Sequence, residues 1–161
     1  MKDSILIIDD EPELRNLLSK LINLEGYRVQ TAESGKGGLA LINKEDFAVI
    51  ITDVRLPDIN GIELIKNIKK INPFTEVIVL TAYGTIEDGV RAIKEGAFDY
   101  ITKGDEDNKI VPVVQRAVEK AKMSYRIEQL EKQVGEKYHF ENIIGESKEI
   151  KLNTGFDYFS I

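Results

Sequence analysis

Four short hydrophobic runs in the sequence each end at a residue suited to phosphate or metal chemistry. They end at the paired acids Asp9 and Asp10, at Asp53, at Thr81 and at Lys103. Carboxylates bind Mg²⁺, which keeps several waters and often accepts a phosphate oxygen. An aspartate can also attack phosphorus to form an aspartyl phosphate, while a hydroxyl and an ammonium stabilise the phosphoryl oxygens. Together, these residue types predict phosphoryl chemistry assisted by a divalent cation.

Taken singly, most of these residues have an ordinary structural explanation. Asp10 would usually cap a helix, and Thr81 would usually cap a turn. Lys103 would usually be a solvated charge, and only Asp53 favours a functional role by itself. The functional interpretation therefore depends on all four ends meeting, which requires the runs to be strands of one sheet.

The segments around these ends have the pattern of alternating strands and helices. Val and Ile crowd the short runs, as in fully buried parallel strands. We expect strands at residues 5–8, 27–31, 48–52, 76–80 and 98–102, and helices at 11–24, 34–43, 62–71 and 85–95. This alternation predicts an α/β fold, a doubly wound five-stranded parallel sheet with helices on both faces. The carboxyl ends of its strands share the edge where such sheets bind ligands.

Composition excludes several other classes of protein. The 161 residues carry a net charge of -6, which argues against wrapping nucleic acid through phosphate contacts. The chain has no cysteine, so disulfides, zinc–thiolate sites and thiol catalysis are excluded. No apolar run is long enough to span a membrane, and the N-terminus lacks a signal peptide. We expect a cytoplasmic protein with one compact domain and an additional segment.

A long helical pattern follows Lys103, from about residue 110 to 134. Pro112 is expected in its first turn, where a missing N–H does no harm. Apolar residues form a heptad-like seam with one phase shift: first Val114, Val118, Ala121 and Tyr125, then Met123, Ile127, Leu130 and Val134. The helix could pack entirely on its own domain, or it could form a parallel coiled coil with a second copy. We favour the dimer.

Over roughly residues 3–120, the chain resembles the receiver domain of two-component response regulators. The resemblance is carried by Ile7-Ile8-Asp9-Asp10-Glu11, Asp53-Val54-Arg55-Leu56-Pro57-Asp58-Ile59-Asn60-Gly61, Leu80-Thr81-Ala82 and Asp99-Tyr100-Ile101-Thr102-Lys103. It implies a flavodoxin-like fold with strand order 2-1-3-4-5. It also implies that a sensor histidine kinase supplies a phosphoryl group to the chain. The expected chemistry is limited to self-phosphotransfer and autodephosphorylation, so the chain is not expected to be an enzyme.

The resemblance assigns a role to each residue of the predicted magnesium site. Asp53 would be the phosphoacceptor. Asp10 and Asp53 would bind Mg²⁺ directly, and Asp9 would bind it through water. The backbone carbonyl of Arg55 would be the remaining protein ligand.

The resemblance also assigns the residues that sense the phosphoryl group. Thr81 and Lys103 would hold its oxygens, and Tyr100 would be the switch aromatic that turns inward as Thr81 moves. Without the family, Tyr100 would be interpreted as a strand aromatic that simply packs. The family usually has a proline after the lysine, commonly in a cis peptide, whereas this chain has Gly104. We therefore expect a more flexible loop there and a less fixed Lys103.

A second resemblance narrows the subfamily to NtrC-like activators of sigma-54-dependent transcription. It rests on three motifs: Thr81-Ala82-Tyr83-Gly84-Thr85-Ile86, Glu95-Gly96-Ala97-Phe98-Asp99-Tyr100 and Phe140-Glu141-Asn142-Ile143-Ile144-Gly145-Glu146-Ser147. The third motif is similar to the start of that family's AAA+ ATPase domain. We expect a receiver at residues 1–120, a helical linker at 121–137, the start of the AAA+ domain at 138–151 and an unassigned tail at 152–161. DNA and sigma-54 RNA polymerase would be contacted only through domains absent from this chain.

Two alternatives to a phosphorylated receiver remain open. One is a Mg²⁺-dependent phosphohydrolase similar to haloacid dehalogenases, which carry the nucleophile after the first strand in a D-x-D pattern. Here the first strand is followed by Asp9-Asp10, the candidate nucleophile follows the third strand, and no capping domain is visible. The other is a pseudo-receiver that binds partners without phosphorylation. The complete set of acids, threonine and lysine argues against it, whereas Gly104 keeps it open.

Overall fold

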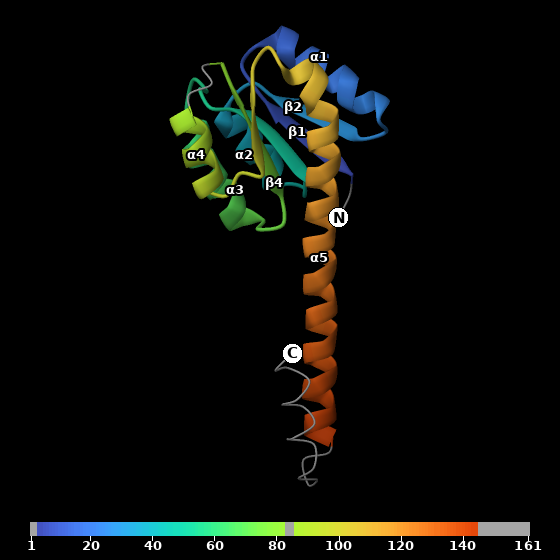
Figure 1. The fold of residues 1–161 in the computed structure, drawn as a ribbon. Coiled ribbons are helices and arrows are strands. Elements are labelled where there is room, and N and C mark those ends of the chain that lie inside the picture. The colour runs from blue at the N-terminus through green and yellow to red at the C-terminus, as the bar shows by residue number, and fades with distance from the viewer. Residues whose placement is uncertain (1–2, 83–85, 145–161) are drawn as a thin grey trace. The chain divides into compact units, whose positions relative to one another are not determined.

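The computed structural model describes residues 3–82 and 86–144, with side chains up to residue 137. The strands are β1 (Ser4–Ile8), β2 (Arg28–Ala32), β3 (Val49–Asp53), β4 (Glu76–Thr81) and β5 (Asp99–Thr102). The helices are α1 (Pro12–Leu24), α2 (Gly35–Ile42), α3 (Gly61–Ile71), α4 (Ile86–Lys94) and α5 (Glu106–Ile144). All strand pairs are parallel and the order is β2-β1-β3-β4-β5, which confirms the predicted topology (Figure 1).

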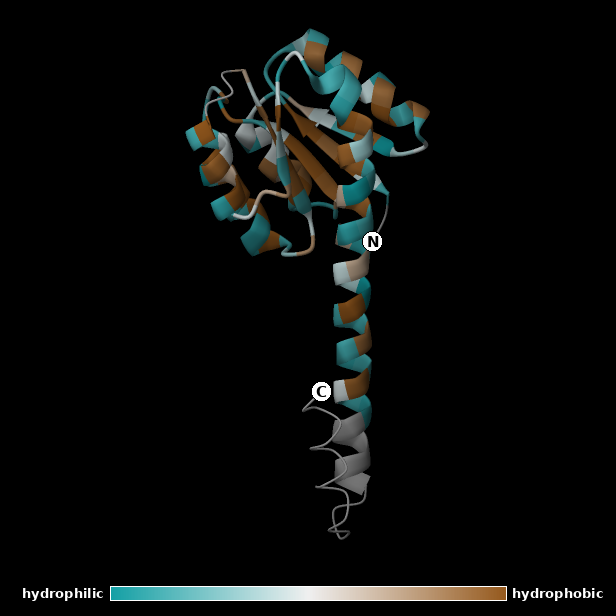
Figure 2. Cartoon of the chain, viewed as in Figure 1, coloured by the Kyte–Doolittle hydropathy of each residue, from teal (hydrophilic) through white to brown (hydrophobic). Residues whose placement is uncertain are grey.

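The sheet separates two hydrophobic cores, one on each face. Helix α1 and the first part of α5 cover one face, and α2, α3 and α4 cover the other (Figure 1). The strands between them are strongly hydrophobic (Figure 2). β1, β3 and β4 are buried along their whole length, whereas the edge strands β2 and β5 are partly exposed. The three central strands therefore form the rigid support from which the site residues follow.

Local signals explain where the helices begin. Pro12 occupies the first position of α1, where no backbone donor is required. The side-chain oxygen of Ser34 accepts from Gly37 N at the start of α2, and that of Asn60 accepts from Ile62 N at the start of α3. Thr85, which the sequence suggests as a cap for α4, lies outside the described residues.

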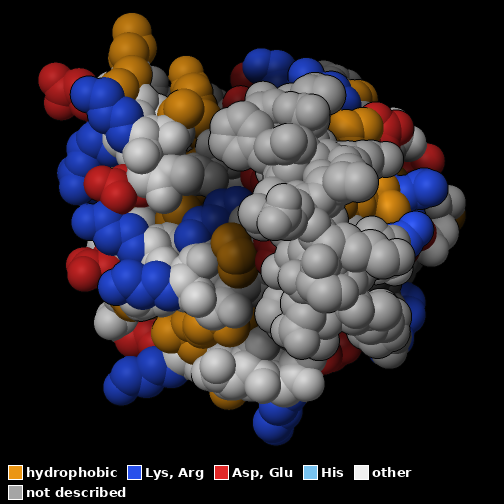
Figure 3. All heavy atoms as spheres, turned by 90° about the horizontal axis from the view of Figure 1, so that it is seen from below, with side chains coloured by type: hydrophobic (Ala, Val, Ile, Leu, Met, Phe, Trp, Pro, Cys, Tyr) orange, Lys and Arg blue, Asp and Glu red, His pale blue; other side chains and the backbone are white. Residues whose placement is uncertain are grey.

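The last turns of α3 and α4 carry basic side chains, which complement the partial negative charge at a helix C-terminus. These residues are Lys69, Lys70, Arg91 and Lys94. Basic side chains, drawn blue, gather on the α3–α4 side of the face shown in Figure 3. None of the described helices has a segment long and apolar enough to cross a membrane.

Helix α5 differs from the expectation at both ends. It begins at Glu106, so Pro112 lies in its second turn rather than its first and removes one backbone hydrogen bond there. It continues past Val134 to Ile144, because the glycine that follows Val134 costs only about 1 kcal/mol relative to alanine inside a helix. The described part of the expected AAA+ segment, residues 138–144, is helical, and its remainder and the tail at 152–161 lie outside the described residues.

The chain divides into two compact units, Met1–Met123 and Ser124–Ile161, and α5 contributes to both. In the first unit, Val114, Val118 and Ala121 are buried against the sheet. The other half of the predicted seam is exposed. The phase shift in the apolar pattern therefore marks the change from buried to exposed apolar residues along α5.

Candidate phosphoacceptor site

The parallel register brings the predicted site residues together at one edge of the sheet. Asp53 ends β3 and pairs with Leu80, and Thr81 ends β4 and pairs with Thr102, the last residue of β5. Lys103 comes next, and its backbone N–H donates to the carbonyl of Thr81 at 2.7 Å. Asp10, Asp53, Arg55, Thr81 and Lys103 all line one pocket of about 210 Å³.

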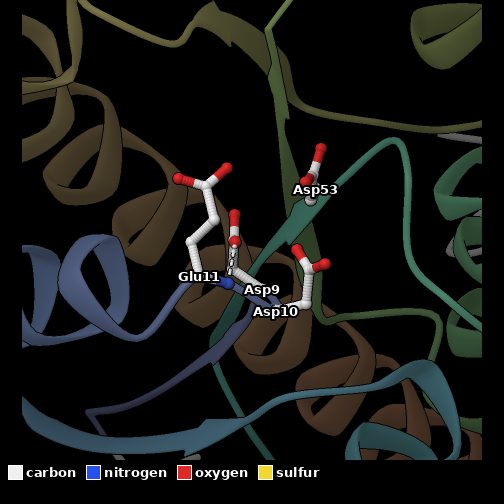
Figure 4. Close-up of side chains that lie close together, drawn as sticks. All are labelled: Asp9, Asp10, Glu11 and Asp53. Atoms are coloured by element: carbon white, nitrogen blue, oxygen red, sulfur yellow. Dashed lines mark hydrogen bonds between the residues drawn. The ribbon is translucent and has the colours of Figure 1, made fainter.

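Four acids from two segments form a cluster at this edge. Asp9, Asp10 and Glu11 follow β1, and Asp53 ends β3 (Figure 4). Each offers one carboxylate oxygen, and these four oxygens all lie within 4.8 Å of one another. Mutual repulsion makes such a cluster costly without a cation. The arrangement therefore needs positive charge at its centre.

Lys103 supplies part of that charge. Its Nζ lies 2.9 Å from Asp53 Oδ2, 2.9 Å from Glu11 Oε1 and 3.1 Å from Asp9 Oδ2, and its side chain is only 12% exposed. Burial by itself lowers the pKa of Lys103, but the close contacts with the three carboxylates outweigh it and raise the pKa above its ordinary value. Sequence reasoning assigned no role to Glu11, although it lies in the first motif next to the predicted acids.

Gly104 allows the chain to turn directly after the lysine. Its φ is +106°, a conformation that side chains disfavour, and no cis peptide occurs among the described residues. The Gly104 N–H donates to a carboxylate oxygen of Glu106, at the start of α5. Lys103 therefore reaches the acids without the proline that the family usually places here.

Asp9 is fully buried, and its two oxygens have different environments. Oδ1 accepts a hydrogen bond from Glu11 N at 2.8 Å, whereas Oδ2 lies within ion-pair distance of Lys103 but forms no hydrogen bond. Burial raises the pKa of Asp9. A buried carboxylate oxygen without a hydrogen bond, among other anionic oxygens, is what a hard cation would compensate. The donor set therefore fits Mg²⁺.

The loop after β3 holds its backbone close to the Asp53 carboxylate. Arg55 N donates to Asp53 Oδ1 at 3.1 Å, and Arg55 pairs with Asn60 in a short antiparallel bridge. Gly61 N closes the loop by donating to the Val54 carbonyl at 2.7 Å. These bonds keep Arg55, whose carbonyl is the predicted fourth metal ligand, beside the predicted phosphoacceptor.

Tyr100 does not reach this pocket. This residue is 38% exposed and lines a separate groove between β5 and α5. The ring lies against Gly89 in α4, where an added Cβ would be only 2.7 Å from two ring carbons. Thr81, in contrast, is buried and lines the site pocket. Gly89 therefore has a packing role in α4, because it makes room for the tyrosine ring.

The family described as response regulator receiver domain matches residues 5–115, the segment that contains all these site residues. The chain belongs to this family. The transcriptional regulatory protein GlrR of Escherichia coli is 38% identical to this receiver over 117 residues, which cover 73% of this chain and 26% of that protein. The regulatory protein AtoC of Escherichia coli is 32% identical over 143 residues, which cover 89% of this chain and 31% of that protein.

Solved structures agree with this assignment. The beryllofluoride-activated receiver domain dimer of NtrC4 superimposes with a TM-score of 0.71 at 32% identity, and the match covers 74% of this chain and 98% of that one. The relatives are NtrC-type response regulators. The receiver chain spans only about a quarter to a third of the length of the two curated relatives.

The lysine at the centre of the acid cluster predicts a pH-dependent contribution to stability. Because folding raises the pKa of Lys103, its stabilisation is complete below the unfolded value of 10.5 and is lost as pH rises above it. Without Mg²⁺, Lys103→Met should lower the unfolding free energy by about 2 kcal/mol near pH 8, because the acids lose their counter-charge. In urea titrations this difference should shrink toward about pH 12.

A matched control separates this effect from the general effect of replacing a lysine on the surface by methionine. Lys109 is exposed, and among the described residues its ammonium pairs only with Asp105, one helical turn away. Lys109→Met should therefore change stability by less than about 0.5 kcal/mol at either pH. If the loss of unfolding free energy in Lys103→Met stays constant across the alkaline range, the assigned ion pairs are contradicted.

Proposed function

We propose that the receiver accepts a phosphoryl group on Asp53 from a sensor histidine kinase. A carboxylate oxygen of Asp53 attacks phosphorus, the bond from phosphorus to the donor breaks, and the leaving group takes the electron pair. The observation that carries the proposal is the position of Asp53 at the pocket, with Lys103 Nζ at 2.9 Å and a backbone donor at 3.1 Å. These contacts orient the carboxylate before the donor arrives.

The same proposal gives the acids the task of holding Mg²⁺. Asp10, Asp53 and the carbonyl of Arg55 would be direct ligands, and Asp9 would act through water. When bound, the ion offsets the charge that develops on the transferring group. The cluster of carboxylate oxygens that includes Asp9, Asp10 and Asp53 supports the choice of these acids as ligands.

Thr81 and Lys103 then stabilise the phosphoryl oxygens in the product. Thr81, which lines the pocket, can donate its hydroxyl hydrogen, and Lys103 can exchange one carboxylate partner for a phosphoryl oxygen. Movement of Thr81 would make room for Tyr100 to turn inward, so that a local charge change alters the outer surface. The present outward position of Tyr100 against Gly89 would be the starting state of this switch.

The likeness to NtrC-type regulators supports a role in controlling a sigma-54-dependent transcription activator. The proposal assigns no contact with DNA or sigma-54 RNA polymerase to the receiver itself. A cytoplasmic location, which is usual for receivers, belongs to the same proposal.

Acetyl phosphate with Mg²⁺ tests the proposed chemistry. Intact mass spectrometry should show the addition of one phosphoryl group, with acetate as the leaving group. Catalytic turnover of many phosphomonoesters without a stable adduct would favour a phosphohydrolase instead. An unchanged mass together with unimpaired partner binding would favour a pseudo-receiver.

The exposed half of α5 supports a homodimer through the linker helix. Ile127, Leu130 and Val134 are 50%, 50% and 46% exposed, and they are spaced by three and four residues. This is the spacing at which a second copy of the helix would cover them in a coiled coil. The related NtrC4 receiver is a dimer in its beryllofluoride-activated form.

Charges on the seam are expected to break this dimer. The double variant Ile127→Glu with Leu130→Glu should shift the solution mass, measured by light scattering over a range of concentrations, from dimer to monomer. Gln129→Glu, which adds a charge off the seam, should leave the dimer intact. A wild-type protein that is monomeric with and without beryllofluoride would rule out the coiled coil for this chain.

A further inference from the structure

The carboxylate of Asp58 caps a helix that lies far from it in the sequence. Its Oδ1 accepts a hydrogen bond from Gly35 N at 2.9 Å, and its Oδ2 accepts one from Lys36 N at 2.8 Å. Gly35 and Lys36 are the first two residues of α2, whose leading N–H groups have no partner within the helix. Asp58 therefore satisfies two backbone donors of another element with one side chain.

Helix α2 is a weak helix that benefits from this external cap. Its sequence GKGGLALI contains three glycines, and its first turn has no acidic residue. The side chain of its own N-cap, Ser34, accepts a hydrogen bond from Gly37 N at 3.1 Å. The carboxylate of Asp58 supplies the negative charge that a helix N-terminus favours. The hydrogen bonds from Lys36 and Gly35 also hold the pKa of Asp58 below its usual range.

The contact is close as well as polar. A Cβ added to Gly35 would lie 2.0 Å from Cγ2 of Ile59, the residue after Asp58. Gly35 is buried, so the loop is packed directly onto the first residue of α2. The loop is therefore anchored to α2 through both a pair of hydrogen bonds and a steric fit.

The anchored loop is the one that carries the phosphoacceptor site. It leaves β3 at Asp53, and its other end is fixed to α3, where Asn60 caps the helix and Gly61 N bonds to Val54. Arg55 lies in the loop between the end of β3 and the start of α3, and it donates its N–H to Asp53 Oδ1. A change at Asp58 would therefore be transmitted to Arg55 through only two intervening residues.

We propose that Asp58 is a positioning residue for the phosphoacceptor site. Its bidentate cap on α2 fixes the loop so that the backbone of Arg55 stays beside Asp53. The inference rests on the proposed function, because it names a residue that sets the metal ligand geometry of that site. It also implies that α2 and the metal site are coupled, so that Mg²⁺ binding strengthens the cap and the cap strengthens Mg²⁺ binding.

The matched pair Asp58→Ala and Ser34→Ala tests the proposal in the whole chain. Both variants remove a cap from the N-terminus of α2, but only Asp58→Ala releases the loop. Both should lower the urea midpoint. Asp58→Ala should weaken Mg²⁺ binding in a calorimetric titration by about 10-fold, the lower end for residues that orient ligands. Ser34→Ala should stay within about twofold of wild type, since it leaves the loop bonds intact.

Two further measurements distinguish a role of Asp58 in positioning the loop from a general effect on the stability of the fold. Asp58→Asn keeps one carbonyl acceptor and should recover part of the Mg²⁺ affinity that Asp58→Ala loses. In the absence of metal, amide hydrogen exchange at Arg55 should be faster in Asp58→Ala than in wild type and unchanged in Ser34→Ala.

Each outcome decides between the inference and the function on which it rests. Wild-type Mg²⁺ affinity in Asp58→Ala would overturn the inference, and so would equal losses in Asp58→Ala and Ser34→Ala. A wild-type chain that binds no Mg²⁺ and takes up no phosphoryl group would overturn the proposed function. The exchange measurement would still decide whether Asp58 anchors the loop.

Discussion

Asp53→Asn is expected to abolish phosphoryl transfer to the receiver. The carboxamide has no anionic oxygen to attack phosphorus, and it offers Lys103 no charge to pair with at the 2.9 Å contact seen in the structure. Loss of a nucleophile of this kind lowers the rate by at least about 10³-fold. With acetyl phosphate and Mg²⁺, intact mass spectrometry should detect one added phosphoryl group on wild type and none on the variant.

The control for this experiment is an aspartate outside the site. Asp46 is exposed in the loop before β3, at the opposite end of that strand, and accepts a hydrogen bond from Asn72. Asp46→Asn should take up the phosphoryl group like wild type. Asp53→Asn should remain folded, because it removes one charge from a crowded acid cluster and keeps an acceptor for Arg55 N. Equal labelling of wild type and Asp53→Asn would show that another residue is the acceptor.

Gly61→Ala is expected to cause a large loss of stability. The new Cβ would lie 2.2 Å from the backbone oxygen of Asp53 and 2.9 Å from Cα of Val54. Backbone atoms cannot move aside as a flexible side chain would, so the loop or α3 must shift. We expect a loss of about 3 kcal/mol or more in unfolding free energy, at or above the upper end for overpacking. Urea titration followed by circular dichroism measures it.

The same substitution should impair the site, because the displaced atoms belong to Asp53 and its neighbour. Gly135→Ala is the matched control, since a methyl there meets no described atom within 4 Å apart from its chain neighbours and its own helix backbone. The exchange of glycine for alanine inside a helix is favourable by about 1 kcal/mol, so Gly135→Ala should not destabilise the chain. A urea midpoint for Gly61→Ala equal to that of wild type would contradict the close approach of α3 to β3.

Much of the fold could be predicted because its signals are local. Runs of Val and Ile near residues 5, 49 and 77 have the length and composition of buried parallel strands, and the structure buries them fully. Parallel strands place their carboxyl ends at one edge, which is why Asp53, Thr81 and Lys103 could be grouped from sequence. The strand order itself came from resemblance to receivers, since periodicity does not determine which strands are neighbours.

The extent of α5 was predicted less well. Its apolar seam indicates two sets of residues, but the pattern predicts a helix from about residue 110 to 134, whereas the helix extends from Glu106 to Ile144. Pro112 is tolerated in the second turn because the packing of Val113, Val114 and Ala117 outweighs one missing hydrogen bond. The ends of a helix depend on the summed free-energy contributions of many residues, whereas a single proline or glycine supplies only one of these contributions.

The sequence by itself determined the alternation of elements and the chemical types at the strand ends, because both follow from residues close together in the chain. Only the tertiary structure decided which distant groups meet. It joined Lys103 to Glu11, joined Asp58 to the first N–H groups of α2, and placed Tyr100 on Gly89 rather than in the pocket. Each of these contacts depends on how loops and helices pack, and neither residue type nor spacing records that packing.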